Sequence, residues 1–325
     1  MGHTHPTLVG AVRDQVGNLV HVSNLFYTEQ QIDLAEQLSQ CFGGGKCFFA
    51  NSGAEANEGA VKLARRYSQD KGEQGRTDIV TAFNSFHGRT LAMVAATGQP
   101  DKRRRFGPLL GGFTHVKLND TAELESAING RTCAVMLEPI QGEGGVNPVT
   151  ARYLETARRL CDERDVLLIL DEVQTGVGRT GRFFAFDHFG VRPDIVVLAK
   201  GLGGGVPIGA FIASDRVSGA FAPGDHGSTF GGNCLASAAA LSVLEVLESE
   251  SLVENARDQG ERLRNKLNGL SDRSRLIEEV RGLGLMVGIE LRKPVAPEVV
   301  SHALGAGLVI NAIGDTILRL LPPLI

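Results

Sequence analysis

Apolar runs and segments of helical periodicity alternate along the first 250 residues of the chain. The apolar runs are continuous rather than alternating with polar residues, which is typical of parallel strands covered on both faces. The predicted strands are 47–50, 79–83, 134–138, 166–171, 195–200 and 208–213, and the predicted helices are 54–70, 121–129, 151–164 and 233–249. This alternation predicts an α/β fold with a mainly parallel sheet flanked by helices.

The pattern changes after residue 250, where a polar helical segment is followed by shorter apolar runs. The predicted elements there are a helix at 252–270, a strand at 284–291, a short helix from 296, and strands at 307–311 and 317–321. We therefore expect a large domain over 1–250 and a smaller C-terminal α+β domain over 251–325.

The composition of the chain is that of an ordinary globular protein. Its 325 residues are 42% hydrophobic and 22% charged, with a formal net charge of −4, which is ample for one large and one small core. The longest basic run, 102–105, is interpreted as a solvated helix end or loop, so no nucleic-acid partner is expected. The sequence contains no apolar stretch of about 20 residues, no signal peptide and no C-x-x-C pair, which favours a cytoplasmic protein away from membranes.

Two predicted strands end in side chains that carry chemistry. Asp171 ends the run 166–170, and Lys200 ends the run 195–199 and opens a glycine-rich segment. Because parallel strands present their carboxyl ends at one edge of a sheet, we expect the carboxylate and the amine to face one crevice. A lysine for a Schiff base and an aspartate that keeps a pyridine nitrogen protonated are what a pyridoxal phosphate enzyme requires. A structural salt bridge is the alternative for Asp171, since a buried carboxylate needs a partner.

The start of the helix at 54–70 is a candidate anion site. Ser52 and Glu55 have the spacing of a capping box, and Gly53 leaves the backbone N–H groups of the first turn accessible. A purely structural helix cap is the alternative. Beside a lysine such as Lys200, this helix start favours a phosphate site.

Three further loops carry candidate side chains. Phe86 follows a predicted strand and can stack on a flat cofactor, while Arg89 can pair with a carboxylate. Glu143 lies among glycines after another strand, and the hydroxyl-rich loop 227–233 precedes a long helix. A packed phenylalanine, a surface arginine and a solvated carboxylate remain alternatives for the first three residues.

Three other motifs are rejected. The G-x-G-x-x-G match at 176–181 begins several residues past its strand, and no amphipathic helix follows it. The glycines at 43–45 lack the hydroxyl residue of a P-loop. His3 and His5 have no acidic or cysteine partners, so no metal is expected.

Taken in this order, the motifs resemble those of class III pyridoxal phosphate-dependent aminotransferases of fold type I, and most closely the acetylornithine aminotransferase group. The blocks that carry the resemblance are Asn-Ser-Gly-Ala-Glu-Ala-Asn from Asn51, Ser-Phe-His-Gly-Arg-Thr from Ser85, Glu-Pro-Ile-Gln-Gly-Glu-Gly-Gly-Val from Glu138, Leu-Asp-Glu-Val-Gln-Thr-Gly from Leu170 and Gly-Ser-Thr-Phe-Gly-Gly-Asn from Gly227. The resemblance covers almost the entire chain. It implies transfer of the terminal amino group of N2-acetylornithine to 2-oxoglutarate, a step of arginine biosynthesis.

The resemblance also implies which residues hold pyridoxal 5'-phosphate. The cofactor-binding residues would be Ser52, Gly53, Ala54, Phe86, His87, Asp171, Val173, Gln174, Lys200 and Thr229. Lys200 would form the Schiff base, Asp171 would pair with the ring nitrogen, and Gln174 would contact the phenolic oxygen. Thr229 would reach the phosphate held by a partner subunit, which implies a homodimer with shared sites.

Four residues would select the substrates. Arg89 would bind a substrate carboxylate, and Arg319 would bind the α-carboxylate of glutamate or 2-oxoglutarate. Glu143 would engage Arg319 when the substrate lacks that second carboxylate, and Ser228 would also contact substrate.

Relatives of this group carry further residues before the stretch at 2–6 and after the double proline at 322–323. The resemblance therefore leads us to expect a chain that lacks an N-terminal arm and the end of the small domain. Other class III aminotransferases, acting on succinylornithine, ornithine, 4-aminobutyrate, N-succinyl-diaminopimelate or a carrier-bound lysine precursor, remain alternatives. A non-catalytic homologue is an alternative from a different class.

Overall fold

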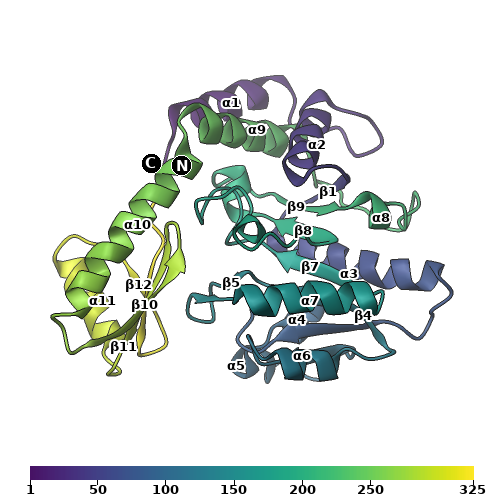
Figure 1. Cartoon of the computed structure of the whole chain (residues 1–325). Coiled ribbons are helices and arrows are strands. Elements are labelled where there is room, and N and C mark those ends of the chain that lie inside the picture. The colour runs from purple at the N-terminus through teal and green to yellow at the C-terminus, as the bar shows by residue number, and fades with distance from the viewer.

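The computed structural model describes residues 1–325 and contains two separate main sheets (Figure 1). The larger sheet has the strand order β1-β9-β8-β7-β4-β2-β3, the smaller one has the order β10-β11-β13-β12, and β5 and β6 form a short ladder of their own. The strands are β1 Lys46–Ala50, β2 Asp78–Ala82, β3 Phe113–Val116, β4 Thr132–Leu137, β5 Ile140–Gln141, β6 Asn147–Pro148, β7 Leu167–Asp171, β8 Ile195–Leu198, β9 Gly209–Ala213, β10 Ile277–Leu283, β11 Met286–Leu291, β12 Asn311–Ile313 and β13 Ile317–Leu320. The helices are α1 Pro6–Asn18, α2 Glu29–Phe42, α3 Gly53–Asp70, α4 Leu91–Ala96, α5 Pro100–Arg103, α6 Thr121–Ala127, α7 Ala151–Glu163, α8 Asp215–Ser218, α9 Cys234–Ser249, α10 Leu252–Ser271 and α11 Ala296–Gly305, with short 3₁₀ helices η1 Ala185–His188 and η2 Lys200–Gly203.

The larger sheet is mainly parallel, which confirms the predicted fold class. Strands β3, β2, β4, β7 and β8 pair in parallel, whereas β9 runs antiparallel to both β8 and β1. Between β8 and β9 the chain forms only η2 and turns. A parallel neighbour requires a crossover of a dozen or more residues, usually through a helix, so this short connection returns the chain in the opposite direction.

The central strands are buried on both faces, as their continuous apolar runs predict. Leu168 and Leu170 belong to one hydrophobic cluster, while Leu167 and Ile169 of the same strand belong to a second. Helix α7 packs against β4 and β7, and α3 packs against β8 and β9. The alternation of side chains along β7 therefore builds a separate core on each face of the sheet.

Helices α1 and α2 and the edge strands β3 and β10 were not predicted from the sequence. Helices α1 and α2 pack on α9, beside β1 in Figure 1. Strands β3 and β10 each have a neighbour on one side only, and polar residues interrupt their apolar runs. The strand predicted at 307–311 is wrong in its position, because α11 extends to Gly305 and the chain then turns through Gly307 before β12 begins at Asn311.

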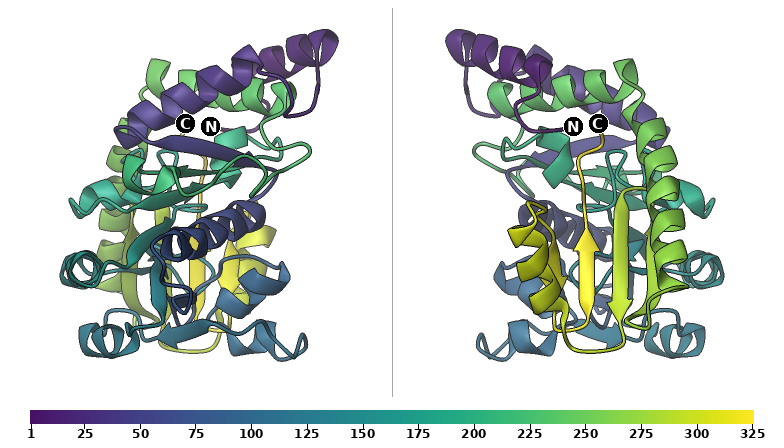
Figure 2. Two further views of the ribbon diagram at one scale, coloured as in Figure 1. Left: turned by 90° about the vertical axis from the view of Figure 1, so that its right-hand side faces the viewer. Right: turned by 90° about the vertical axis from the view of Figure 1, so that its left-hand side faces the viewer.

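Helix α10 connects the larger sheet to the smaller one, and it packs against α9 at one end and against β10 at the other. Helices α10 and α11 pack against the strands of the smaller sheet, and the two chain ends lie side by side (Figure 2). Met286 of β11 clusters with Ile140 and Val146 of the large unit, which joins the two parts. The domain division after residue 250 stays a prediction that the two separate sheets favour. None of the helices is long and apolar enough to cross a membrane.

Candidate active site

A cavity of about 470 Å³ opens at the carboxyl ends of the central strands, in the position where ligands bind in open α/β sheets. Its walls come from the segments that follow β1, β2, β4, β7 and β8. The predicted residues that line it are Ser52, Gly53, Ala54, Phe86, His87, Arg89, Glu143, Asp171, Val173, Gln174 and Lys200. Most of the predicted site is thus brought together in one cavity.

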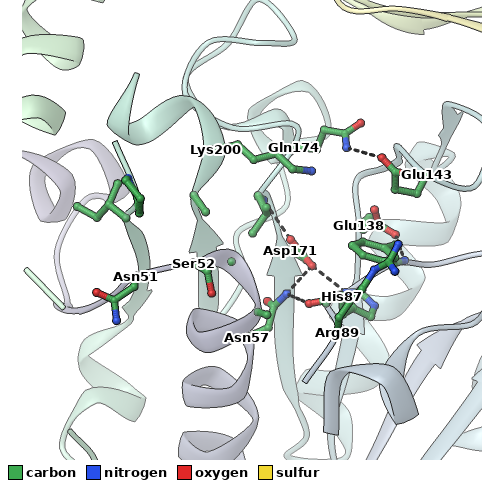
Figure 3. Close-up of a pocket in the computed structure, with 18 of the residues that line it drawn as sticks. Asn51, Ser52, Asn57, His87, Arg89, Glu138, Glu143, Asp171, Gln174 and Lys200 are labelled. Atoms are coloured by element: carbon green, nitrogen blue, oxygen red, sulfur yellow. Dashed lines mark hydrogen bonds and ion pairs between the residues drawn. The ribbon is translucent and has the colours of Figure 1, made fainter. Parts of the chain in front are cut away.

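Lys200 and Asp171 both reach this cavity, from neighbouring parallel strands (Figure 3). Asp171 is the last residue of β7, as predicted. Lys200 is not the last residue of β8, since the strand ends at Leu198 and Lys200 begins η2 with a φ of 43°. A positive φ is uncommon for a residue with a side chain, and such conformations cluster at functional sites.

The buried carboxylate of Asp171 is held by three hydrogen-bond donors. Its Oδ2 accepts bonds of 2.8 Å from Asn57 Nδ2 and 2.8 Å from His87 Nδ1, and its Oδ1 accepts a bond of 3.0 Å from the backbone N–H of Val173. Asp171 is 4% exposed. The protein itself therefore satisfies the carboxylate, and its burial alone does not require a cofactor. The network fixes the orientation of the carboxylate at the cavity wall.

His87 and Glu138 add two titratable groups behind this wall. Burial lowers the pKa of the His87 imidazole, but the bond to Asp171 and its charge raise it more, so the pKa lies above its usual value. Burial raises the pKa of Glu138 to about 7, against the opposing effects of His87 and of the backbone N–H groups of Phe86 and Gly142. The Nε2 of His87 is buried and has no hydrogen-bond partner in the protein.

Asn57 and Glu138 line the cavity but are not among the site residues predicted from the sequence. Asn57 lies one turn beyond Ala54 on α3, and its Nδ2 also donates to the carbonyl oxygen of His87. Glu138 directly follows β4 in the same way that Asp171 ends β7. Its place at the end of a buried strand was the signal for Glu138, whereas for Asn57 the only signal was its spacing along the helix face.

The start of α3 has the geometry of an anion site. Ser52 is the N-cap, and its Oγ accepts a bond of 3.3 Å from the backbone N–H of Glu55. Glu55 in turn accepts from the backbone N–H of Asn51 at 2.7 Å, which fixes the chain where it enters the helix. A Cβ atom at Gly53 would lie 2.8 Å from both methyl groups of Val173, so only glycine allows this close approach.

Arg319 of β13, on the smaller sheet, is not among the residues that line the cavity, but it binds Glu143, which is. The Nη1 of Arg319 lies 2.7 Å from Glu143 Oε1 and donates to the carbonyl oxygen of Gly142 at 3.0 Å. Gln174 Nε2 lies 3.5 Å from the same Glu143 oxygen, and Figure 3 shows these two side chains turned toward each other. Burial raises the pKa of Glu143, but the bond to Arg319 and its charge lower it more, so the pKa falls below its usual value.

Ser228 and Thr229 are not brought to the cavity of their own chain. The Oγ of Ser228 accepts bonds from Asn51 Nδ2 at 3.3 Å and from the backbone N–H of Gly231 at 3.0 Å. Thr229 is exposed. Contact of Ser228 with substrate, and of Thr229 with the phosphate in a partner subunit, stay predictions.

Comparisons with known proteins agree with this geometry. The family described as aminotransferase class-III matches residues 1–325. The acetylornithine aminotransferase of Caldanaerobacter subterraneus subsp. tengcongensis is 51% identical over 325 residues, which are 100% of this chain and 82% of the relative. The solved ornithine aminotransferase of Toxoplasma gondii superposes with a TM-score of 0.96 at 36% identity, covering 99% of this chain and 78% of that one.

An amine transaminase from an uncultivated Pseudomonas species, solved in its PLP-bound form, has a TM-score of 0.93 at 32% identity and covers 99% of this chain and 83% of that one. The fold type and the family resemblance predicted from the sequence are both confirmed. The chain belongs to the class-III aminotransferase family.

Proposed function

We propose that this protein transfers the terminal amino group of N2-acetylornithine to 2-oxoglutarate, with pyridoxal 5'-phosphate as cofactor. The products are N-acetylglutamate 5-semialdehyde and glutamate, and the reaction belongs to arginine biosynthesis. The observation that carries the chemistry is that Lys200, Asp171 and the start of α3 line one cavity. The identity of 51% to an acetylornithine aminotransferase supports the choice of amino donor.

The residues of the cavity fit pyridoxal phosphate at each of its distinct groups. The backbone N–H groups of Gly53 and Ala54 start a helix of 18 residues and can take the phosphate. The Asp171 carboxylate can face the ring nitrogen, and the Lys200 amine can bond to the aldehyde carbon. Val173 packs tightly against Gly53 and supplies an apolar side for the ring.

The chemistry divides between the cofactor and the chain. Bound pyridoxal phosphate supplies an electron sink for the electron pair that remains when a proton leaves the substrate. The Nζ of Lys200 would act as the base that takes that proton from the carbon bearing the amino group. Asp171 would direct its carboxylate at the ring nitrogen, because Asn57, His87 and the Val173 N–H hold both carboxylate oxygens in place.

Arg319 and Glu143 distinguish the two substrates. N2-acetylornithine has no carboxylate on its reacting carbon, so the ion pair of 2.7 Å stays closed and neutralises Arg319. 2-Oxoglutarate has such a carboxylate, which replaces Glu143 on the guanidinium. The pair is suited to this exchange, because the Glu143 side chain is 32% exposed and can turn to water, while Arg319, which is 12% exposed, gains the ligand carboxylate as its new partner.

We extend the proposal to the oligomeric state of the protein and to its cellular compartment. Thr229 would complete the phosphate site of a second copy, so the active form is a homodimer with shared sites. The absence of a membrane-spanning helix is compatible with a cytoplasmic enzyme.

Absorbance spectroscopy and a substrate panel test the proposal. Purified protein with pyridoxal phosphate should show a visible absorbance band from the cofactor bound to Lys200, and it should transaminate N2-acetylornithine faster than ornithine, succinylornithine or 4-aminobutyrate. The Lys200→Ala variant should lose both the band and turnover, whereas Lys293→Ala, at an exposed lysine, should keep them. A Lys200→Ala protein with both intact would refute the assignment, and a higher kcat/KM for another donor would reassign the substrate.

A further inference from the structure

The basic run at 102–105 is not uniformly solvated. Arg104 and Arg105 are exposed, and Arg104 pairs with Asp101 at the surface. Lys102, in contrast, is half-buried, and its Nζ lies 4.7 Å from the centroid of the Phe86 ring. Phe86 lines the active-site cavity. The short helix α5 therefore places one ammonium group against a residue that lines the cavity, although Lys102 itself is not among the lining residues. The prediction of a solvated run is wrong for Lys102.

A second cation shares the same aromatic ring. The Cζ of Arg89 lies 5.8 Å from the Phe86 centroid, and neither Arg89 nor Lys102 forms an ion pair with a carboxylate of the protein. Glu143 is the acid with the largest electrostatic effect on Lys102, but its Oε1 is bound to Arg319 at 2.7 Å. The charge of Arg89 acts against that of Lys102, and an anion bound beside both would reduce this repulsion.

The charged groups around Lys102 also indicate that its ammonium lacks a neutralising anion. Burial lowers the pKa of the Lys102 ammonium, Glu143 and Glu138 oppose this, and Arg89 and Arg319 lower it further. The pKa of Lys102 is lowered overall, so the acidic groups of the protein do not fully offset its burial and the neighbouring positive charges. A ligand carboxylate would supply the missing charge.

We propose that Lys102 and Arg89 together bind the substrate carboxylate that is remote from the reacting carbon, which makes Lys102 a residue that determines specificity. This inference rests on the proposed function. N2-acetylornithine has its α-carboxylate in that remote position, and 2-oxoglutarate has its γ-carboxylate there. Arg319 is then left for the carboxylate next to the reacting carbon, which only 2-oxoglutarate has.

The competing explanation is that Lys102 only orients the Phe86 ring by a cation–π contact. The two roles predict different patterns. If Lys102 binds a carboxylate, its loss affects only ligands with a remote carboxylate. If it only positions the ring, its loss affects every substrate alike, because all of them react at the same cofactor.

Binding of glutarate, an unreactive analogue of 2-oxoglutarate without the keto group, tests the proposal independently of turnover. Calorimetry on the cofactor-loaded protein should show about tenfold weaker glutarate binding in Lys102→Met, since a desolvated charge-assisted contact is lost. Lys102→Arg should keep most of the affinity. Arg105→Met is the matched control, because it removes one positive charge from an exposed position of the same run.

Steady-state kinetics separate the two roles of Lys102. In Lys102→Met the KM for 2-oxoglutarate should rise about tenfold with little change in kcat, while pyruvate, which has no remote carboxylate, should react as in the parent protein. The proposal would be overturned if Lys102→Met bound glutarate as tightly as the parent, or if its kcat/KM with pyruvate fell as much as with 2-oxoglutarate. An equal loss of glutarate affinity in Arg105→Met, or no glutarate binding to the parent protein, would overturn it as well. If the parent does not transaminate N2-acetylornithine but Lys102→Met still loses glutarate binding, the proposed donor fails and the Lys102 site stands.

Discussion

Two groups of residues at the active-site cavity differ in burial and therefore in what they can do. The buried network, formed by Asp171, His87 and Asn57, lies behind the predicted ring position, and each of its members is at most 4% exposed. The charged rim, formed by Arg319, Glu143 and Arg89, is less buried: the side chains of Arg319 and Glu143 are 12% and 32% exposed, and Arg89 is exposed. Both groups of residues carry charge, but water has more access to the rim than to the buried network.

The contrast in burial explains how one cavity can keep its cofactor and still exchange substrates. Breaking a buried charged pair leaves an uncompensated charge and costs about 3–5 kcal/mol, so the buried network keeps one arrangement. A fully exposed ion pair contributes about 1 kcal/mol or less. The Glu143–Arg319 pair is only partly exposed, and a ligand carboxylate that replaces Glu143 keeps Arg319 paired, so the exchange leaves no buried charge without a partner. The following experiments test this contrast.

The largest effect is expected from Asp171→Asn. The change removes the negative charge that faces the ring nitrogen and places an amide among three donors, so kcat/KM should fall about a thousandfold. Steady-state kinetics with N2-acetylornithine measure this. Asp165→Asn, at a half-exposed carboxylate bound to Lys71 and Arg216, should change kcat/KM little. A loss below tenfold in Asp171→Asn would contradict the importance of the buried network.

The second prediction concerns Glu172, the buried neighbour of Asp171. Its carboxylate accepts from the backbone N–H groups of Ala185 and Phe186 and from Thr175, yet burial raises its pKa to about 7. Because this folded-state pKa lies above the usual value of 4.5 for a glutamate, the folded protein binds more protons than the unfolded one between these two values. The contribution of Glu172 to stability should therefore fall as the pH rises through this window, by on the order of 3 kcal/mol.

Denaturant unfolding at pH 5 and pH 8 measures this contribution as the difference between the parent and Glu172→Gln. The rim should show the opposite sign, because the pKa of Glu143 is lowered: its contribution should be present at neutral pH and lost in acid. Parallel pH profiles for the parent and Glu172→Gln would refute the first half of this contrast.

Arg319→Gln should have the third largest effect. The KM for 2-oxoglutarate should rise about a hundredfold, because the α-carboxylate loses its cationic partner. The KM for N2-acetylornithine should change far less, since that donor leaves Arg319 paired with Glu143. Arg292→Gln, at an exposed arginine that directly follows β11, is the control. Equal effects on both substrates would show that Arg319 maintains the structure of the wall rather than selecting the acceptor.

The smallest effect is expected from Asn57→Ala. Asp171 keeps His87 and the Val173 N–H as donors, so kcat/KM should fall only about tenfold, the equivalent of one buried hydrogen bond. Asn265→Ala, at an exposed position of α10, makes the same change on another helix and should be neutral. Activity equal to that of the parent would show that two donors suffice to orient Asp171.

Much of the site could be predicted because its residues lie at the ends of strands or at the start of a helix. Lys200, Asp171 and the Ser52–Ala54 turn share this property, and parallel strands bring their carboxyl ends to one edge of the sheet. Asn57 and Lys102 could not be predicted in this way. Both lie within helices, where local sequence does not reveal which distant group the side chain meets.

The strands of the large sheet follow from the sequence alone, since continuous apolar runs must be covered on both faces, and so do the side chains that those strands present at their ends. Three features follow only from the folded chain: Arg319 lies against Glu143, β9 reverses direction, and Lys102 is half-buried over Phe86 while Arg105 is exposed. Periodicity and spacing are local properties of the chain. Charge pairing and desolvation depend instead on which distant segments come into contact.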